Sequence, residues 1–119
     1  MKNNWTAAGA AFGFLAVAIG AFGAHQLKNV LSPEMMEVYR TGVLYHLLHA
    51  VIITAIGFTA NPKYFKAALF LSIGIILFSF SLYIYTVTGI KALVMITPAG
   101  GVSFLIGWLL IFISSLNRK

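Results

Sequence analysis

Cysteine is absent from this sequence of 119 residues, which excludes disulfide bonds and thiolate metal ligands. Acidic side chains are nearly absent too, since Glu34 and Glu37 are the only two. With 8% charged residues, the chain is a poor fit to a soluble domain. It shows no nucleophile with a base, no glycine-rich phosphate loop and no zinc-protease motif. We therefore expect no catalytic residue, no metal and no cofactor, and a protein that is not an enzyme.

What the sequence has instead is long apolar runs, at residues 5–24, 39–60, 64–88 and 92–116. Each run reaches the roughly 20 residues that a helix needs to cross a bilayer. The first run imitates a signal peptide, but its length indicates a retained helix. We expect an all-α integral membrane four-helix bundle with short loops, as a single membrane domain over residues 1–119.

The formal charge of +6 comes from basic residues scattered singly between the runs, so we expect no nucleic-acid partner. Five of them would share one side of the membrane: Lys2, Lys63, Lys66, Arg118 and Lys119. Three would share the other side: Lys28, Arg40 and Lys91. By the positive-inside rule, this asymmetry predicts that both termini are cytoplasmic.

Local signals mark where the helices begin and end. Ser32 is suited to cap the second helix, with Pro33 in its first turn, and Asn61 with Pro62 repeats the pattern for the third. Gly89 is suited to end the third helix in a left-handed conformation. The short connection at Asn61 predicts that the second and third helices are antiparallel neighbours.

A helix breaker lies inside the last apolar run, at Thr97 and Pro98, followed by Gly100 and Gly101. Thr97 can cap a helix that starts at Pro98, which would leave a separate outer segment before it. Alternatively, one helix continues through Pro98 with a kink. Either arrangement predicts a break or kink near Pro98, with freed backbone groups that neighbouring helices must satisfy.

The first helix carries a stripe of small residues at Gly9, Gly13, Ala16, Gly20 and Gly23. Steps of three and four residues place them on one helix face. Such a face lets another helix approach closely, so we interpret the stripe as a packing seam. A backbone-lined ligand site is the alternative.

His46 and His49 are three residues apart, so they share a helix face with Gly42 and Ile53. Imidazoles are costly in hydrocarbon unless they are paired, so this face should point into the bundle. A structural hydrogen-bonding role competes with a ligand or proton-relay role. A metal site would need further ligands, and the only other candidates in the sequence are His25, Glu34 and Glu37.

If the termini are cytoplasmic, polar groups from all helices reach the outer half of the membrane. The candidate ligand site or polar cluster comprises His25, Arg40, His46, His49, Ser79, Tyr83, Thr97, Pro98, Gly100 and Gly101. These groups either hold a ligand or only satisfy one another.

Six short motifs together resemble a known family: residues 20–25 (GAFGAH), 45–50 (YHLLHA), 77–83 (LFSFSLY), 88–89 (TG), 96–101 (ITPAGG) and 107–108 (GW). Over essentially its whole length, the chain resembles the uncharacterised small four-helix membrane proteins known as domain of unknown function four-two-three. The resemblance implies a location in the bacterial plasma membrane and supplies no activity.

The function predicted from these features is a binding or accessory protein. Its polar pocket would hold a lipid headgroup, a small amphiphile or a partner helix in the outer half of the membrane. The alternative is a minimal oligomeric transporter or channel that uses His49 as a polar or proton-relay group. The expected partners are membrane lipids and either a second copy of the chain or another membrane protein.

Overall fold

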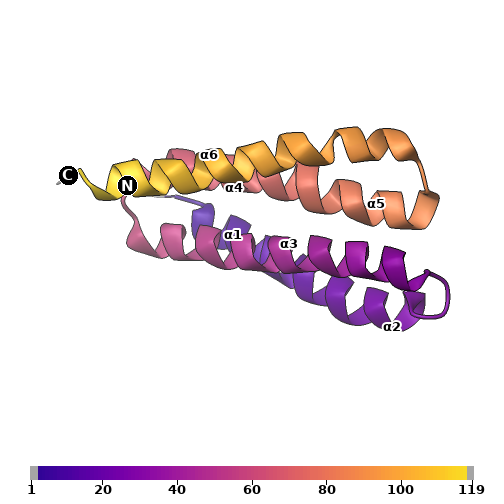
Figure 1. The fold of residues 1–119 in the computed structure, drawn as a ribbon. Helices are drawn as coiled ribbons and strands as arrows, with labels where there is room; N and C mark the ends of the chain where they lie inside the picture. Colours follow the sequence, from indigo (N-terminus) through magenta and orange to yellow (C-terminus); the bar gives the residue numbers. More distant parts are fainter. Residues whose placement is uncertain (1–2, 118–119) are drawn as a thin grey trace.

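The computed structural model describes residues 3–117, which form helices and short connections without any β-strand. Four helices are long and apolar enough to cross a membrane, and we call them spans 1 to 4: Trp5–Leu27, Pro33–Thr59, Pro62–Thr88 and Lys91–Ser115. The predicted all-α four-helix membrane class is confirmed. Figure 1 shows the spans lying side by side in an elongated bundle.

The spans are built from α-helix interrupted by other helix types. Span 1 contains α1 (Trp5–Ala18), the π-helical η1 (Ile19–Gly23) and α2 (Ala24–Leu27), and span 2 is α3 (Pro33–Thr59). Span 3 contains the 3₁₀ turn η2 (Pro62–Tyr64), α4 (Phe65–Gly74), the π-helical η3 (Ile75–Phe80) and α5 (Ser81–Thr88). Span 4 contains the 3₁₀ segment η4 (Lys91–Met95) and α6 (Thr97–Ser115). The sequence signals used above did not anticipate the two π segments.

The helix ends follow the sequence signals closely. The side chains of Ser32 and Asn61 each accept a backbone N–H from the following turn, at 3.2 and 3.0 Å, as predicted. Gly89 ends span 3 with φ of 72°, also as predicted. Span 2 is followed by Ala60, which is in a left-handed conformation with φ of 53°. Because this residue is not a glycine, the sequence did not predict a left-handed helix end here.

The break in the fourth helix is a separate short segment rather than a kink. The 3₁₀ segment η4 precedes α6, and Pro98 lies in the first turn of α6. The expectation that Thr97 caps this helix is wrong, because its side chain makes no capping bond. Its hydroxyl instead forms a hydrogen bond of 2.7 Å with the hydroxyl of Ser81 on span 3.

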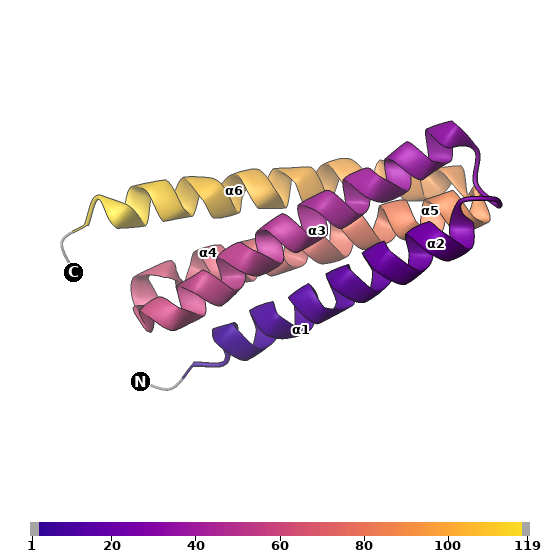
Figure 2. The same cartoon turned by 90° about the horizontal axis from the view of Figure 1, so that it is seen from below.

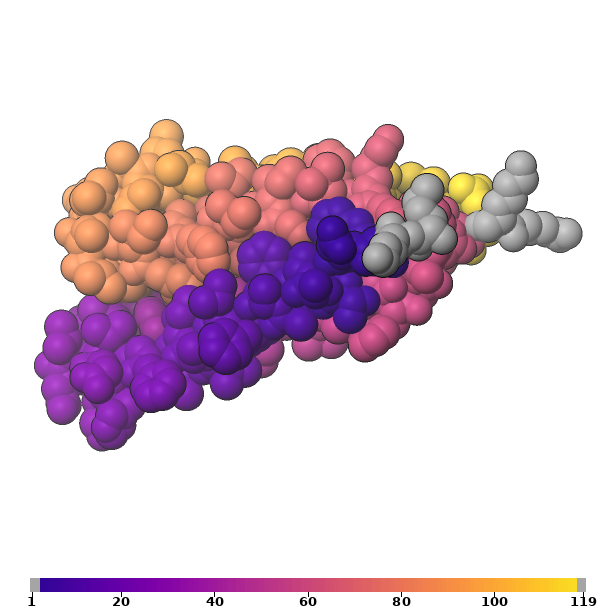
Figure 3. Space-filling view, turned by 180° about the vertical axis from the view of Figure 1, so that it is seen from behind, coloured from indigo at the N-terminus to yellow at the C-terminus, as the bar shows by residue number. Residues whose placement is uncertain are grey.

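The spans pack as two helical pairs. α1 packs along α3, α4 packs along α6, and α3 joins the pairs by contacting α4, η3 and α5 (Figures 1 and 2). Span 1 is therefore peripheral, and the space-filling view in Figure 3 shows its indigo and violet atoms along the surface of the bundle. Ile53, Leu71 and Ile75 are fully buried at the centre of the core.

Glycines bring helix backbones into close contact within each pair. In the first pair, a Cβ atom at Gly9 would overlap the Thr54 backbone, and one at Gly57 would overlap Thr6. In the second, a Cβ atom at Gly100 would overlap the backbone of Phe78. Close approach of this kind is the main source of favourable packing between helices in lipid.

The rest of the small-residue stripe of span 1 also faces α3, and the tightness of its contacts varies along the helix. Ala16 is buried, and a Cβ atom at Gly20 would lie 2.9 Å from a methyl group of Val43. At Gly23 it would overlap the hydroxyl of Tyr39, and at Gly13 it would lie 3.9 Å from Ala50, an ordinary contact distance. The tightest contacts therefore lie near the two ends of span 1.

Candidate functional site

His46 lies at the centre of a closed polar cluster between spans 2 and 3. Its side chain is fully buried, and its Nδ1 forms a hydrogen bond of 2.8 Å with the hydroxyl of Tyr83. Beside it, the Ser79 hydroxyl donates to the backbone carbonyl of Gly42 at 2.8 Å. Tyr39 donates its hydroxyl to the carbonyl of Ile19, which begins the π segment of span 1. These bonds tie spans 1, 2 and 3 together.

One atom of this cluster is unsatisfied. His46 Nε2 is buried and makes no hydrogen bond with any residue in the described range, although the backbone of Phe12 lies near the ring. The ring is enclosed by the aromatic edges of Phe12 and Phe80, with centroid distances of 6.2 and 5.4 Å. His46 is thus enclosed by protein and offers no open face to a ligand.

His49 belongs to a different environment, between spans 2 and 4. Its ring stacks on Phe104 at a centroid distance of 3.8 Å, and Trp108 Nε1 donates to its Nε2 at 3.0 Å. An indole nitrogen can only donate, so Nε2 must be the unprotonated acceptor. Nδ1 therefore carries the proton and donates to the Tyr45 carbonyl at 2.7 Å. Both nitrogens are occupied, which defines His49 as a neutral imidazole.

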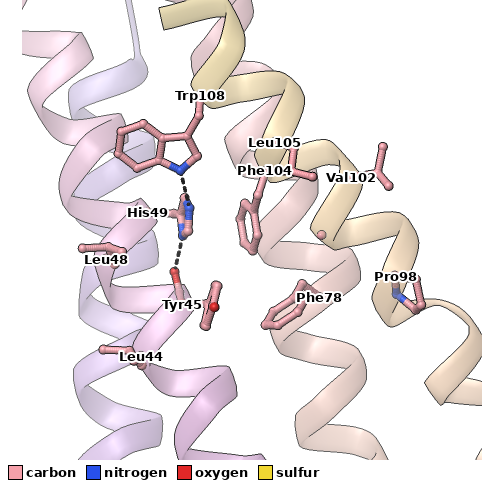
Figure 4. A pocket seen from close by; sticks show the side chains of 11 residues that line it. Leu44, Tyr45, Leu48, His49, Phe78, Pro98, Val102, Phe104, Leu105 and Trp108 are labelled. Atoms are coloured by element: carbon pink, nitrogen blue, oxygen red, sulfur yellow. Dashed lines mark hydrogen bonds between the residues drawn. The ribbon is translucent and has the colours of Figure 1, made fainter. Parts of the chain in front are cut away.

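A groove of about 660 Å³ opens beside His49, and we call it the lateral groove (Figure 4). Its lining comes from α3, η3 and α6: Leu44, Tyr45, Leu48, His49, Phe78, Pro98, Gly101, Val102, Phe104, Leu105 and Trp108. Phe104 and His49 form a buried floor, whereas the leucines and Val102 are exposed along the rims. The groove opens on the side of the bundle, where lipid surrounds a spanning helix.

Residues at and just after the break form part of the wall of this groove. Pro98 and Gly101 line it directly, and a Cβ atom at Gly101 would meet nothing within 4 Å. Gly100 points the other way, onto the backbone of Phe78 in the π segment η3. Of the two adjacent glycines, Gly100 therefore allows spans 3 and 4 to pack closely, whereas Gly101 leaves space in the groove.

The structure separates the candidate set into distinct places. His46, Ser79 and Tyr83 form the closed cluster, and His49, Pro98 and Gly101 line the lateral groove. Thr97 pairs with Ser81, and Gly100 packs against span 3.

His25 and Arg40 join neither group. Both are exposed, and neither forms a hydrogen bond or ion pair within residues 3–117. The helix face of α3 that lines the groove continues toward the N-terminus of this helix through Thr41 rather than Arg40. Arg40 and Glu37 also form no ion pair there, although their spacing permits one.

Trp108 and Phe104 were not among the site residues predicted from the sequence. A depth argument could have found Trp108, because it lies ten residues after Pro98, just as His49 lies ten residues after Tyr39. At 1.5 Å per residue, His49 is roughly 15 Å along span 2 from Tyr39, and Trp108 is roughly 15 Å along span 4 from Pro98. An indole N–H at that depth needs an acceptor, and His49 is the acceptor at the same level.

The four spans and the groove between two helical pairs define a small polytopic membrane protein. The chain belongs to the family described as Protein of unknown function (DUF423), whose family model matches residues 19–101. This confirms the resemblance inferred from the motifs.

The relatives cover nearly the same length. The chain is 41% identical to the UPF0382 membrane protein YwdK of Bacillus subtilis, over 92% of this chain and 93% of that protein. It is 38% identical to a UPF0382 membrane protein of Haemophilus influenzae, over 100% and 98%. It is 34% identical to the UPF0382 inner membrane protein YgdD of Escherichia coli (strain K12), over 90% and 85%. These names specify a membrane protein and no reaction. No solved structure matches the chain.

Proposed function

We propose that this protein is a binding or accessory protein of the bacterial plasma membrane that holds the apolar chain of a membrane amphiphile in the lateral groove. The observation that carries the proposal is the groove itself, about 660 Å³ in volume beside the His49–Trp108 bond. That volume lies within the range of roughly 300–1,000 Å³ typical of small-molecule sites.

The lining favours a flexible chain over a partner helix. Helices associate in membranes through small residues that allow backbones to approach. Gly101 is the one such residue in the lining, and the other members are branched aliphatic, aromatic or proline side chains. A chain of methylene groups can follow the irregular surface that these side chains leave.

The lining indicates that the groove binds a different part of the ligand from the part that the sequence predicted. A polar pocket for a headgroup was expected from the sequence, but most groove residues are apolar and both nitrogens of His49 are already bonded. The groove therefore suits the hydrocarbon part of an amphiphile, with its headgroup outside. The same bonds weigh against the alternative of a transporter that uses His49 as a proton relay. We assign no catalytic step.

We place both termini in the cytoplasm, which puts the lateral groove in the outer half of the bilayer. The basis is the excess of basic residues on the terminal side. The groove begins at Pro98, in the first turn of α6 and toward the end of the bundle opposite the termini, and it reaches the middle of the spans at His49 and Trp108.

Native mass spectrometry of protein extracted from its own membrane tests the proposal. The wild-type protein should retain lipid, and Gly101→Phe should lose it because the phenyl ring fills the groove. Gly101→Ala is the matched control, since one added carbon meets no atom within 4 Å and leaves the groove open. Equal lipid retention by Gly101→Phe would contradict the proposal.

A further inference from the structure

We propose that the ligand of the lateral groove is an acyl ester, a glycerolipid whose ester carbonyl accepts a hydrogen bond from the hydroxyl of Tyr45. This inference rests on the proposed function and specifies the chemistry of its ligand. It adds a polar recognition point to a groove that otherwise contacts only hydrocarbon.

Tyr45 offers the groove a hydroxyl that has no hydrogen-bond partner among the described residues. Its ring lines the groove and is held in place by Phe78, at a centroid distance of 4.7 Å, and by stacking with His49 at 6.0 Å. The side chain is 39% exposed, and its hydroxyl bonds to no residue in the described part of the chain. A hydroxyl that faces hydrocarbon without a partner costs free energy, so a bound ligand with an acceptor gains by supplying one.

No other side chain that lines the groove has a free polar group for this role. The lining contains three polar side chains: Tyr45, His49 and Trp108. The single N–H of the Trp108 side chain donates to His49, and the other ring nitrogen of His49 donates to the Tyr45 carbonyl. At the inner end of the groove, the polar side-chain groups are therefore already hydrogen-bonded, and a ligand meets an apolar surface there. A ligand should place its polar group at Tyr45 and its chain toward Trp108.

The depth of Tyr45 along the helix also suits an ester carbonyl. Tyr45 lies six residues after Tyr39, where the second apolar run begins, and this is about 9 Å along the helix. Side chains on a helix lean toward its N-terminus, which returns the hydroxyl toward the membrane boundary. Ester carbonyls of glycerolipids lie at that boundary between headgroups and hydrocarbon. His49 lies a further turn deeper, where only the chain of the lipid would reach.

A pair of lipids that differ only in the linkage tests the inference. The probes are a diacyl phosphatidylglycerol and its diether analogue with the same chains, which lacks both carbonyls. Binding to the delipidated protein is measured by native mass spectrometry titration. The wild-type protein should prefer the diacyl lipid by about three- to tenfold, the effect of one hydrogen bond in a membrane. Tyr45→Phe should bind both lipids equally, at the affinity of the diether lipid.

The outcomes separate the two proposals. Equal binding of both lipids by the wild-type protein, unchanged in Tyr45→Phe, overturns the ester inference and leaves chain binding intact. Undiminished binding of both lipids by Gly101→Phe overturns the proposed function. Tyr45→Phe should also unfold at the wild-type temperature in detergent, because its hydroxyl has no partner within the described residues. A loss of stability would give the hydroxyl a structural role and overturn the inference.

Discussion

Trp108 on span 4 and His49 on span 2 are joined by a hydrogen bond of 3.0 Å from the indole Nε1 to the imidazole Nε2. This bond links the two helical pairs across the lateral groove, where α3 and α6 are separated by the groove volume. It also fixes the imidazole as the Nδ1–H tautomer. His49 and Trp108 thus join the two helical pairs and also line the groove.

The tautomer of His49 is directly measurable. The ¹⁵N chemical shifts of its ring should report a protonated Nδ1 and an unprotonated Nε2. Trp108→Phe should abolish the indole donor and shift the Nε2 resonance. A protonated Nε2 in the wild-type protein would be incompatible with the bond from Trp108.

Removing this bond should also weaken the bundle. Trp108→Phe keeps an aromatic ring but leaves His49 Nε2 without its donor. A double-mutant cycle with His49→Ala, measured by thermal unfolding in detergent, should give a coupling of about 0.6–1.7 kcal/mol. Trp5→Phe serves as the control on the first span. A coupling of zero would show that the bond contributes nothing to stability.

The bond between Tyr83 and His46 offers a second comparison. Tyr83→Phe leaves His46 Nδ1 unpaired as well as Nε2, so we expect a loss of about 1–3 kcal/mol for a buried polar atom without a partner. Tyr85→Phe is the matched control, because its hydroxyl bonds to no described residue. Unfolding temperatures of the two variants in the same detergent should differ clearly. Equal values would place His46 outside the stabilising contacts.

The glycines of span 1 should differ in their tolerance of a side chain. Gly9→Ala should destabilise the protein, since a Cβ atom there overlaps the Thr54 backbone and forces α1 away from α3. Gly13→Ala should be nearly neutral, because its Cβ atom would lie 3.9 Å from Ala50. We expect overpacking at Gly9 to cost about 1–3 kcal/mol in unfolding experiments. The reverse order would mean that α1 packs in a different register.

The topology can be tested with single cysteines, since the chain has none of its own. A cysteine at Gln26 should react with an impermeant thiol reagent in whole cells, while one at Asn117 should be protected. The reason is the excess of basic residues on the side of the termini. Labelling of Asn117→Cys alone would invert the topology, and equal labelling would indicate dual insertion.

The candidate site could be predicted only in part. The spacing of His46 and His49 showed that both side chains point inward, and both are buried. Their separation into a closed cluster and an open groove was not predictable, because it depends on which neighbouring span each ring meets. His25 and Arg40 were grouped with them by depth, but depth along a helix says nothing about direction around it.

By itself, the sequence determined the membrane class, the four spans and most helix ends. These features follow from local physics: the length of apolar runs sets the spans, and single residues such as Ser32, Asn61 and Gly89 set the ends. The tertiary structure alone decided which glycine packs and which leaves space, as Gly100 and Gly101 show. It also decided that Trp108 finds its acceptor on His49. Such contacts join residues far apart in the chain, and their geometry depends on how the two helical pairs cross.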